Sequence, residues 1–208
     1  MEKMTTEILK PAAENLLRAA NLIKRGEIVA FPTETVYGLG ADAFNVAACK
    51  KIYSAKKRPA DKPLTLHVAT FEMIEQIAEI SSAAEKLIEK FLPGPLTLIL
   101  PKKNIVPDFV TCNSKSVGVR FPKNSVAQDF IKIAGVPIAA PSANISGKNP
   151  PTTAQEVFDN LSGKVEIILD GGKCNVGISS TIADISSGEL KILRQGIISA
   201  AQILETLN

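Results

Sequence analysis

The side chains best suited to chemistry gather in four polar segments that contain glycine or proline. These segments are FPTETVYGLGADA from Phe31, KKRPADKPLTLHV from Lys56, APSANISGKNPPT from Ala140 and GISSTIAD from Gly177. Their hydroxyl and amide groups can exchange hydrogen bonds with a ligand, and their glycines allow a ligand to approach the backbone closely. Because the same residue types are common in turns, one segment alone would favour a turn. Four together predict a ligand site.

The most basic stretch of the chain runs from Lys50 to Lys62 and contains a single acid, Asp61. A charge run of this kind is most often a solvated helix face. The formal net charge of the whole chain is only +3, and nucleic-acid binding calls for a basic face rather than a slight excess. Charge by itself therefore leaves both a solvated helix and an anion site open.

Several common chemistries are excluded by what the sequence lacks. His67 is the single histidine, so no H-E-x-x-H zinc site can form, and there is no G-x-S-x-G nucleophile elbow. The Gly-Lys pair at Gly147 lacks the upstream glycine of a P-loop, and Gly38 with Gly40 lacks the third Rossmann glycine. The three cysteines form no C-x-x-C pair, so we expect neither a metal site nor a disulfide framework.

Hydrophobic patterning predicts the elements that position the polar segments. Helices are expected at residues 11–25, about 46–57, 83–91, 154–161 and 200–207. Ser82 and Thr153 each have a glutamate three residues later, which predicts a capping box at both positions. Strands are expected at 28–31, 64–68, 96–100, 117–121, 137–140, 165–169, 181–185 and 190–193.

This alternation predicts an α/β fold with a single domain, residues 1–208, built on one twisted mixed sheet with flanking helices. Ligands would bind at polar loops beyond the strand ends. The N-terminus has no apolar signal-like segment, and no apolar run is long enough for a membrane helix. We therefore expect a cytoplasmic protein without membrane contact.

Seven blocks, in order and with family-like spacing, resemble the YrdC-type threonylcarbamoyl-AMP synthase family over about residues 24–196. They are FPTETVYGLGADA from Phe31, KKRPADKPL from Lys56 with His67, PGPLTLIL from Pro93, VGVRFP from Val117, PIAAPSANISGK from Pro137, GISSTIADIS from Gly177 and ILRQG from Ile192. The resemblance implies a twisted α/β fold with a positively charged concave groove. It also implies the single-domain form, without the additional C-terminal domain of longer relatives.

The resemblance further implies an activity. In that family, a nucleotidyltransferase condenses L-threonine, bicarbonate and ATP to threonylcarbamoyl-AMP and pyrophosphate, and Mg²⁺ arrives with the ATP. A tRNA threonylcarbamoyl-transferase complex then passes the threonylcarbamoyl group to an adenosine of tRNA. Partners would thus be small-molecule substrates, that complex, and tRNA or double-stranded RNA.

Site residues follow from the matched positions. The resemblance implies a catalytic role for Lys56 and Arg58. It implies L-threonine contacts from Thr35, His67, Arg120, Ala140 and Ser180, and ATP contacts from Arg58, Lys62, Ser116, Ser142 and Arg194. Arginine suits Arg120's position because it can grip a carboxylate through two parallel hydrogen bonds. We expect the lysine-rich segment, with Lys56 and Lys62, to form part of a lid, and both Arg58→Ala and Arg120→Ala to abolish activity with little loss of stability.

Four positions depart from the family pattern: Lys62, Pro150, Ser179 and Gln195. Pro150 cannot donate a hydrogen bond from its side chain or backbone nitrogen and is left out of the site. Two other functions remain open. One is an RNA-binding or ribosome-maturation protein without this chemistry, against which stands the scarcity of aromatic stacking platforms. The other is a related domain that transfers carbamoyl from carbamoyl phosphate.

Overall fold

A ten-stranded mixed sheet runs through the part of the chain that the computed structural model describes, residues 4–208. The strand order is β1-β8-β2-β3-β7-β4-β6-β5-β9-β10. The strands are β1 (Glu7–Leu9), β2 (Val29–Phe31), β3 (Gly38–Asp42), β4 (Thr65–His67), β5 (Leu96–Pro101), β6 (Ser116–Arg120), β7 (Ile138–Ala139), β8 (Ile167–Leu169), β9 (Thr181–Asp184) and β10 (Lys191–Arg194).

Parallel and antiparallel pairs alternate where the polar segments come together. β4 pairs parallel with β6 and antiparallel with β7, and β5 pairs antiparallel with β6 and parallel with β9. In these registers His67 lies opposite Arg120, and Thr97 lies opposite Ile182. Segments far apart in the sequence are thereby brought onto neighbouring strands.

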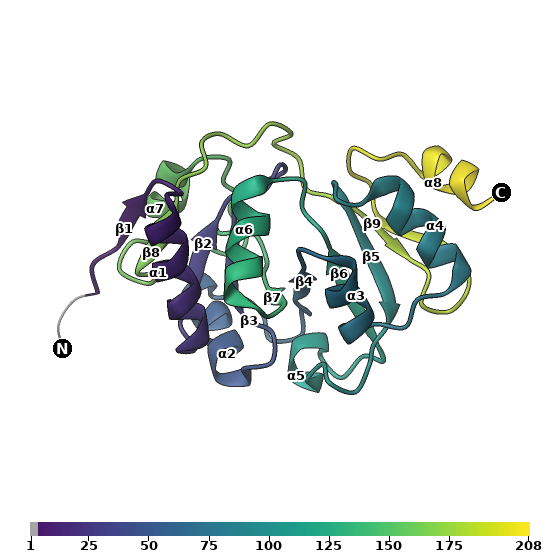
Figure 1. Ribbon diagram of the computed structural model, residues 1–208, viewed down its shortest axis with the longest axis horizontal. Helices are drawn as coiled ribbons and strands as arrows, with labels where there is room; N and C mark the ends of the chain where they lie inside the picture. The colour runs from purple at the N-terminus through teal and green to yellow at the C-terminus, as the bar shows by residue number, and fades with distance from the viewer. Residues whose placement is uncertain (1–3) are drawn as a thin grey trace.

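The helices pack against this sheet, and α1 and α6 lie side by side across it (Figure 1). They are α1 (Ala13–Lys24), α2 (Val46–Lys56), α3 (Phe71–Ile77), α4 (Ser82–Phe91), α5 (Asp108–Thr111), α6 (Ser125–Ala134), α7 (Ala154–Leu161) and α8 (Ala200–Leu207). Buried apolar residues of α1 and α6 form one core cluster with β2, and a larger cluster fills the rest of the fold.

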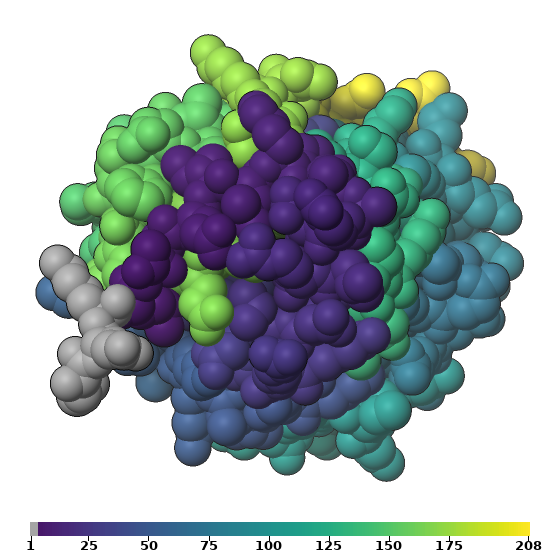
Figure 2. Space-filling view, turned by 60° about the vertical axis from the view of Figure 1, so that its left-hand side comes forward, coloured from purple at the N-terminus to yellow at the C-terminus, as the bar shows by residue number. Residues whose placement is uncertain are grey.

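The N-terminal strand closes one edge of the sheet. β1 pairs parallel with β8, and the space-filling view shows the purple N-terminal residues beside green residues from the later part of the chain (Figure 2). The Thr6 hydroxyl donates to the Val165 carbonyl at 2.6 Å. The two ends of the described chain therefore lie near opposite edges of the sheet. β1 forms one edge, and α8 packs against α4 near the other.

The mixed sheet, its flanking helices and all eight expected strands are confirmed, with boundary differences of a few residues. Five elements were not predicted: β1, β3, α3, α5 and α6. The first two are short or glycine-rich, so their sequences lack a clear period-two pattern. The prediction of Ser82 as a cap is wrong, since Ser81 accepts from the Ala84 N–H and Ser82 is the first helical residue.

Thr153 does cap α7, because its side chain accepts from the Glu156 N–H. The reciprocal half of the capping box is absent, since the Glu156 carboxylate accepts from the N–H and hydroxyl of Thr152 instead. Of the helices in residues 4–208, none combines the length and the apolar character that crossing a membrane requires.

Candidate active site

A cavity of about 520 Å³ lies over one face of the sheet. Every second residue of the central strands lines it: Thr65 and His67 on β4, Ser116, Gly118 and Arg120 on β6, Thr97 and Ile99 on β5, and Ser180, Ile182 and Asp184 along β9. The residues between them, such as Leu66, Val119 and Leu98, belong to the buried core. Because side chains alternate across a strand, one face forms the floor of the cavity while the other packs on helices.

Three loops form the walls of the cavity. They contribute Thr33, Val36 and Tyr37 after β2, Arg58, Lys62 and Pro63 after α2, and Pro141 and Ser142 after β7. The sequence predicted a site beyond the strand ends. The structure instead places the cavity over the sheet face and uses these loops as its rim.

Arg120 is held at the floor by three acceptors that all meet one nitrogen of its guanidinium group. Its Nη2 donates to Thr35 Oγ1 at 2.7 Å, to Glu34 Oε1 at 3.0 Å and to Thr33 Oγ1 at 3.5 Å. Both members of the Arg120–Glu34 ion pair are buried, with side chains 6% and 9% exposed. The Nε of Arg120 is buried without a partner among the described residues.

His67 lies beside Arg120 as a neutral imidazole. Burial, together with the positive charge of Arg120, lowers the pKa of His67 to about 3. Its ring meets the Phe31 ring edge-on, with centroids 5.8 Å apart. Its Nδ1 is buried and has no hydrogen-bond partner in residues 4–208. A neutral imidazole carries one donor and one acceptor nitrogen, so His67 can recognise a polar ligand without adding charge.

Ser180 immediately precedes β9 and contacts the neighbouring strand β5. Its hydroxyl lies 2.7 Å from the Thr97 hydroxyl, and Arg194 donates to both its carbonyl and its hydroxyl. Burial, followed by the positive charge of Arg120, lowers the pKa of Arg194 from its ordinary value. Two guanidinium groups therefore face one cavity, where they favour a ligand with negative charge.

The basic loop after α2 presents Arg58 at the rim. The Arg58 side chain donates to the carbonyls of Lys62 and Pro63, at 3.3 and 2.9 Å, and its guanidinium lies over the Tyr53 ring. The Tyr53 hydroxyl donates to the same Lys62 carbonyl at 2.8 Å. These contacts order a loop that would otherwise be a solvated charge run, and the Arg58 guanidinium lines the cavity.

Lys56 lies behind the cavity wall. It is 2% exposed, and its ammonium donates to the backbone carbonyls of Ser142 and Asn144. Burial, followed by the positive charge of Arg58, lowers the pKa of Lys56 to about 7. The Lys56 side chain thus connects the end of α2 to the loop that contains Ser142. Within that loop, the Ser142 hydroxyl donates to Asn144 Oδ1. This position does not match the expected lid, since Lys56 is covered on all sides.

Nine of the eleven predicted site residues line this one cavity: Arg58, Lys62, His67, Ser116, Arg120, Ala140, Ser142, Ser180 and Arg194. Lys56 and Thr35 do not. Thr35 is fully buried and reaches the cavity through its contact with Arg120. Sequence reasoning missed Glu34, Thr97 and Asp184, although Thr97 stands two residues before Ile99 and a period-two reading of that strand would have found it.

The family model described as Telomere recombination, named for Sua5, YciO and YrdC, matches residues 21–196. The threonylcarbamoyl-AMP synthase of Pyrococcus abyssi is 50% identical over 179 residues, which cover 86% of this chain and 53% of that protein. The threonylcarbamoyl-AMP synthase of Vibrio vulnificus is 34% identical over 185 residues, covering 88% of this chain and 98% of that protein.

Among solved structures, P. abyssi Sua5 complexed with L-threonine superimposes with a TM-score of 0.92 and 44% identity. The match covers 97% of this chain and 60% of that one. The chain spans little more than half the length of several curated relatives, including those of P. abyssi, Bacillus subtilis and Schizosaccharomyces pombe. The family model matches most of this chain, and the V. vulnificus relative is matched over 98% of its own length. The chain therefore belongs to the Sua5/YciO/YrdC family.

Proposed function

We propose that this protein is an L-threonylcarbamoyladenylate synthase, a nucleotidyltransferase that condenses L-threonine, bicarbonate and ATP to threonylcarbamoyl-AMP and pyrophosphate. The observation that carries the proposal is the single cavity over the sheet face, lined by Arg120, His67 and Ser180 together with Arg58 and Arg194. Relatives of 50% and 34% identity bear the name of this enzyme. A carboxylate group and a polyphosphate both require cations, and the cavity offers them at its floor and at its rim.

L-Threonine is assigned to the floor. The buried Arg120 suits its carboxylate through charge-assisted hydrogen bonds, with Thr35 behind the guanidinium. The neutral His67, the hydroxyl of Ser180 and the backbone at Ala140 suit the remaining polar groups. A site built to satisfy a hydroxyl group rejects valine, because the isosteric methyl leaves buried polar groups unpaired.

ATP is assigned to the rim and the adjoining floor. Arg58, Lys62 and Arg194 supply positive charge, and Ser116 and Ser142 supply hydroxyl groups. Phosphoryl and nucleotidyl transfers are catalysed mainly by positioning and by electrostatic stabilisation of the transferring group. We assign that stabilisation to Arg58. Lys56, predicted to be catalytic, supports the same site from behind by holding the Ser142 loop.

Mg²⁺ fits this donor set as a companion of ATP. Asp184 is the one carboxylate among the lining residues, and residues 4–208 contain no cluster of three His, Cys, Asp or Glu side chains suited to a metal ion. Mg²⁺ prefers phosphate oxygens and water and needs few protein ligands. When bound, it would neutralise charge on the phosphates.

The reaction balances in two steps. The threonine amine adds to bicarbonate with loss of water and gives a carbamate. A carbamate oxygen then attacks the α-phosphorus of ATP, and the bond to pyrophosphate breaks. The carbamate loses carbon dioxide readily in water, so it must react with ATP soon after it forms. Binding threonine and ATP in one cavity holds them close enough for this. Exclusion of water by the walls serves the same end.

The activated product requires an acceptor elsewhere. We infer that a tRNA threonylcarbamoyl-transferase complex takes it up to modify tRNA, in the cytoplasm. The basic rim, with Arg58 and Lys62, also suits a phosphate backbone, so direct contact with tRNA or double-stranded RNA is part of the proposal.

Pyrophosphate release by the purified protein tests the function. ATP and bicarbonate are supplied with L-threonine, L-serine, L-valine or no amino acid, and release is followed with a coupled assay. We expect release that requires both bicarbonate and L-threonine. Pyrophosphate release that does not depend on threonine, or no release at all, would contradict the proposal. A parallel assay with carbamoyl phosphate in place of bicarbonate distinguishes the synthase from the related carbamoyl-transferring domain.

A further inference from the structure

Glu34 is an acidic residue whose side chain is buried away from solvent. Its side chain is 9% exposed and pairs with Arg120, itself 6% exposed. In each of the other four ion pairs in the described chain at least one partner is exposed. Burying two charges is costly unless geometry and further hydrogen bonds compensate. A buried pair of which one member, Arg120, lines a ligand cavity therefore calls for a functional reason.

The backbone that carries Glu34 is fixed on both sides. The Glu34 carbonyl accepts from the Val176 N–H at 2.9 Å, and the Thr35 carbonyl accepts from the Gly177 N–H at 3.0 Å. The Thr33 hydroxyl accepts from the Thr35 and Val36 N–H groups, both at 3.2 Å. The loop backbone is held in this way, and the buried Oε1 of Glu34 contacts Arg120, whereas Oε2 is buried without a hydrogen-bond partner in the described chain.

The Glu34 carboxylate acts on one end of the guanidinium. Only Nη2 of Arg120 meets acceptors in the described chain, namely Glu34 and the hydroxyls of Thr33 and Thr35. The Nε is buried and unpaired, while the residue lines the cavity. A planar guanidinium has five donors in a rigid fork, so fixing Nη2 fixes the direction of all the others. Since Nε is buried, Nη1 is the group whose direction is then preset for an anionic ligand.

We propose that Glu34 is a positioning residue that holds Arg120 in the orientation that receives the carboxylate of the amino-acid substrate. The proposal rests on the proposed function for the identity of that substrate. Glu34 also balances charge, since Arg120 and Arg194 both line the cavity and Glu34 offsets part of their repulsion before the substrate arrives. Glu34 does not line the cavity, so its effect on the ligand passes through Arg120.

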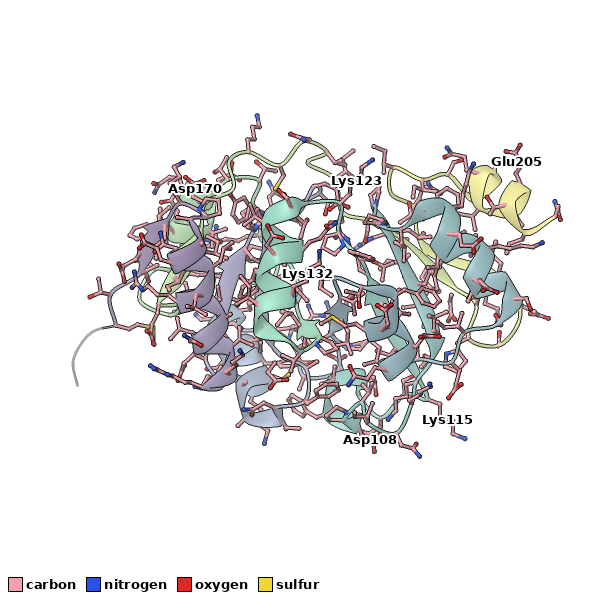
Figure 3. All side chains as sticks on the ribbon, in the orientation of Figure 1. Asp108, Lys115, Lys123, Lys132, Asp170 and Glu205 are labelled. Atoms are coloured by element: carbon pink, nitrogen blue, oxygen red, sulfur yellow. The ribbon has the colours of Figure 1, made fainter. Side chains whose placement is uncertain are left out.

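The experiment measures L-threonine binding by isothermal titration calorimetry to the full chain and to Glu34→Gln. Glutamine keeps an oxygen for Nη2 but removes the charge. Because a charge-assisted hydrogen bond is about twice as strong as a neutral one, we expect the less firmly held Arg120 to weaken threonine binding by about tenfold, with ATP affinity changed by no more than about twofold. Glu205→Gln is the matched control, an exposed acid on α8 at the periphery of the molecule (Figure 3).

A double-mutant cycle separates positioning from a direct contact. In an Arg120→Lys background, Glu34→Gln is expected to change the threonine Kd by less than about threefold, because the group through which it acts is gone. Unchanged or tighter threonine binding by Glu34→Gln, or equal weakening in both backgrounds, overturns the proposal.

A ligand-free measurement keeps the two proposals distinguishable. The Nε–H resonance of Arg120, assigned by its loss in Arg120→Lys, is followed by ¹⁵N NMR in the wild type and in Glu34→Gln. If wild-type protein binds no threonine, the proposed function fails, and the resonance alone decides the positioning role. A shifted and broadened resonance in Glu34→Gln supports an anchored guanidinium, and an identical one overturns it.

Discussion

Arg194 lies against Ser180 through two hydrogen bonds, from Nε to the Ser180 carbonyl at 2.9 Å and from Nη2 to the Ser180 hydroxyl at 3.2 Å. Arg194 is the last residue of β10, and Ser180 immediately precedes β9. In the proposed site, Arg194 belongs to the ATP contacts and Ser180 to the threonine contacts. Their pairing therefore joins the two halves of the site, and a change in one is expected to be felt in the other.

Replacement of Arg194 should affect both substrates. Arg194→Lys keeps the positive charge but cannot reproduce two directed hydrogen bonds from a planar group, so we expect the KM for threonine to rise by about tenfold and the KM for ATP to rise less. Arg194→Ala should raise both. Steady-state pyrophosphate release measures these constants, with the exposed Lys191→Ala on the same strand as the control. A threonine KM that is unchanged in Arg194→Lys would contradict the coupling.

Loss of Arg58 and loss of Arg120 should differ in stability. Arg58 contacts carbonyls of its own loop at the rim, so Arg58→Ala should lower activity while reducing the free energy of unfolding by less than about 1 kcal/mol. Arg120→Ala leaves the Glu34 carboxylate buried and unpaired, which costs about 3–5 kcal/mol. The buried ion pair therefore argues against the expectation that Arg120→Ala loses little stability.

Urea unfolding of the two variants, followed by circular dichroism, tests this difference. Combining Arg120→Ala with Glu34→Gln should recover part of the lost stability, because the stranded charge is removed. Equal transition midpoints for Arg58→Ala and Arg120→Ala would count against the buried ion pair as described.

His67 should make stability depend on pH. Its pKa is lowered from 6.5 to about 3, so below pH 6.5 the unfolded chain binds a proton that the folded chain does not. The contribution to stability is present above pH 6.5 and is lost as the pH falls toward 3. Between pH 7.5 and 5 this loss amounts to about 2 kcal/mol.

Urea titrations of wild type and His67→Gln at both pH values measure the contribution. The wild type should lose about 2 kcal/mol more than the variant. Parallel losses in the two proteins would show that His67 is not held neutral.

The strands and helices with strong patterns were predictable from the sequence, and those that depend on tertiary context were not. The segment 11–25 places Leu16, Ala20 and Ile23 at helical spacing and forms α1. β3 was not expected, because its sequence GLGAD has glycines in place of β-branched residues. Those glycines are required by packing, since a Cβ at Gly40 would lie 2.5 Å from the Ile138 side chain.

The site was predictable as a set of residues and not as an arrangement. The resemblance supplied Arg120 and Ser180 by position, but the alternation that puts both on one face depends on strand registers that are set by pairing across the sheet. Glu34 lies in the segment FPTETVYGLGADA, but nothing in the sequence marks it as the partner of Arg120, which lies 86 residues away. Contacts of that separation are decided by the fold.

The covered position of Lys56 has a consequence for self-modification. Burial lowers the pKa of this amine to about 7, and a lysine amine that loses its proton is a nucleophile. The proposed product is an acylating agent, a carbamoyl group activated by AMP. Because the Lys56 nitrogen is enclosed by the carbonyls of Ser142 and Asn144 and the residue does not line the cavity, the fold keeps this amine apart from the proposed product.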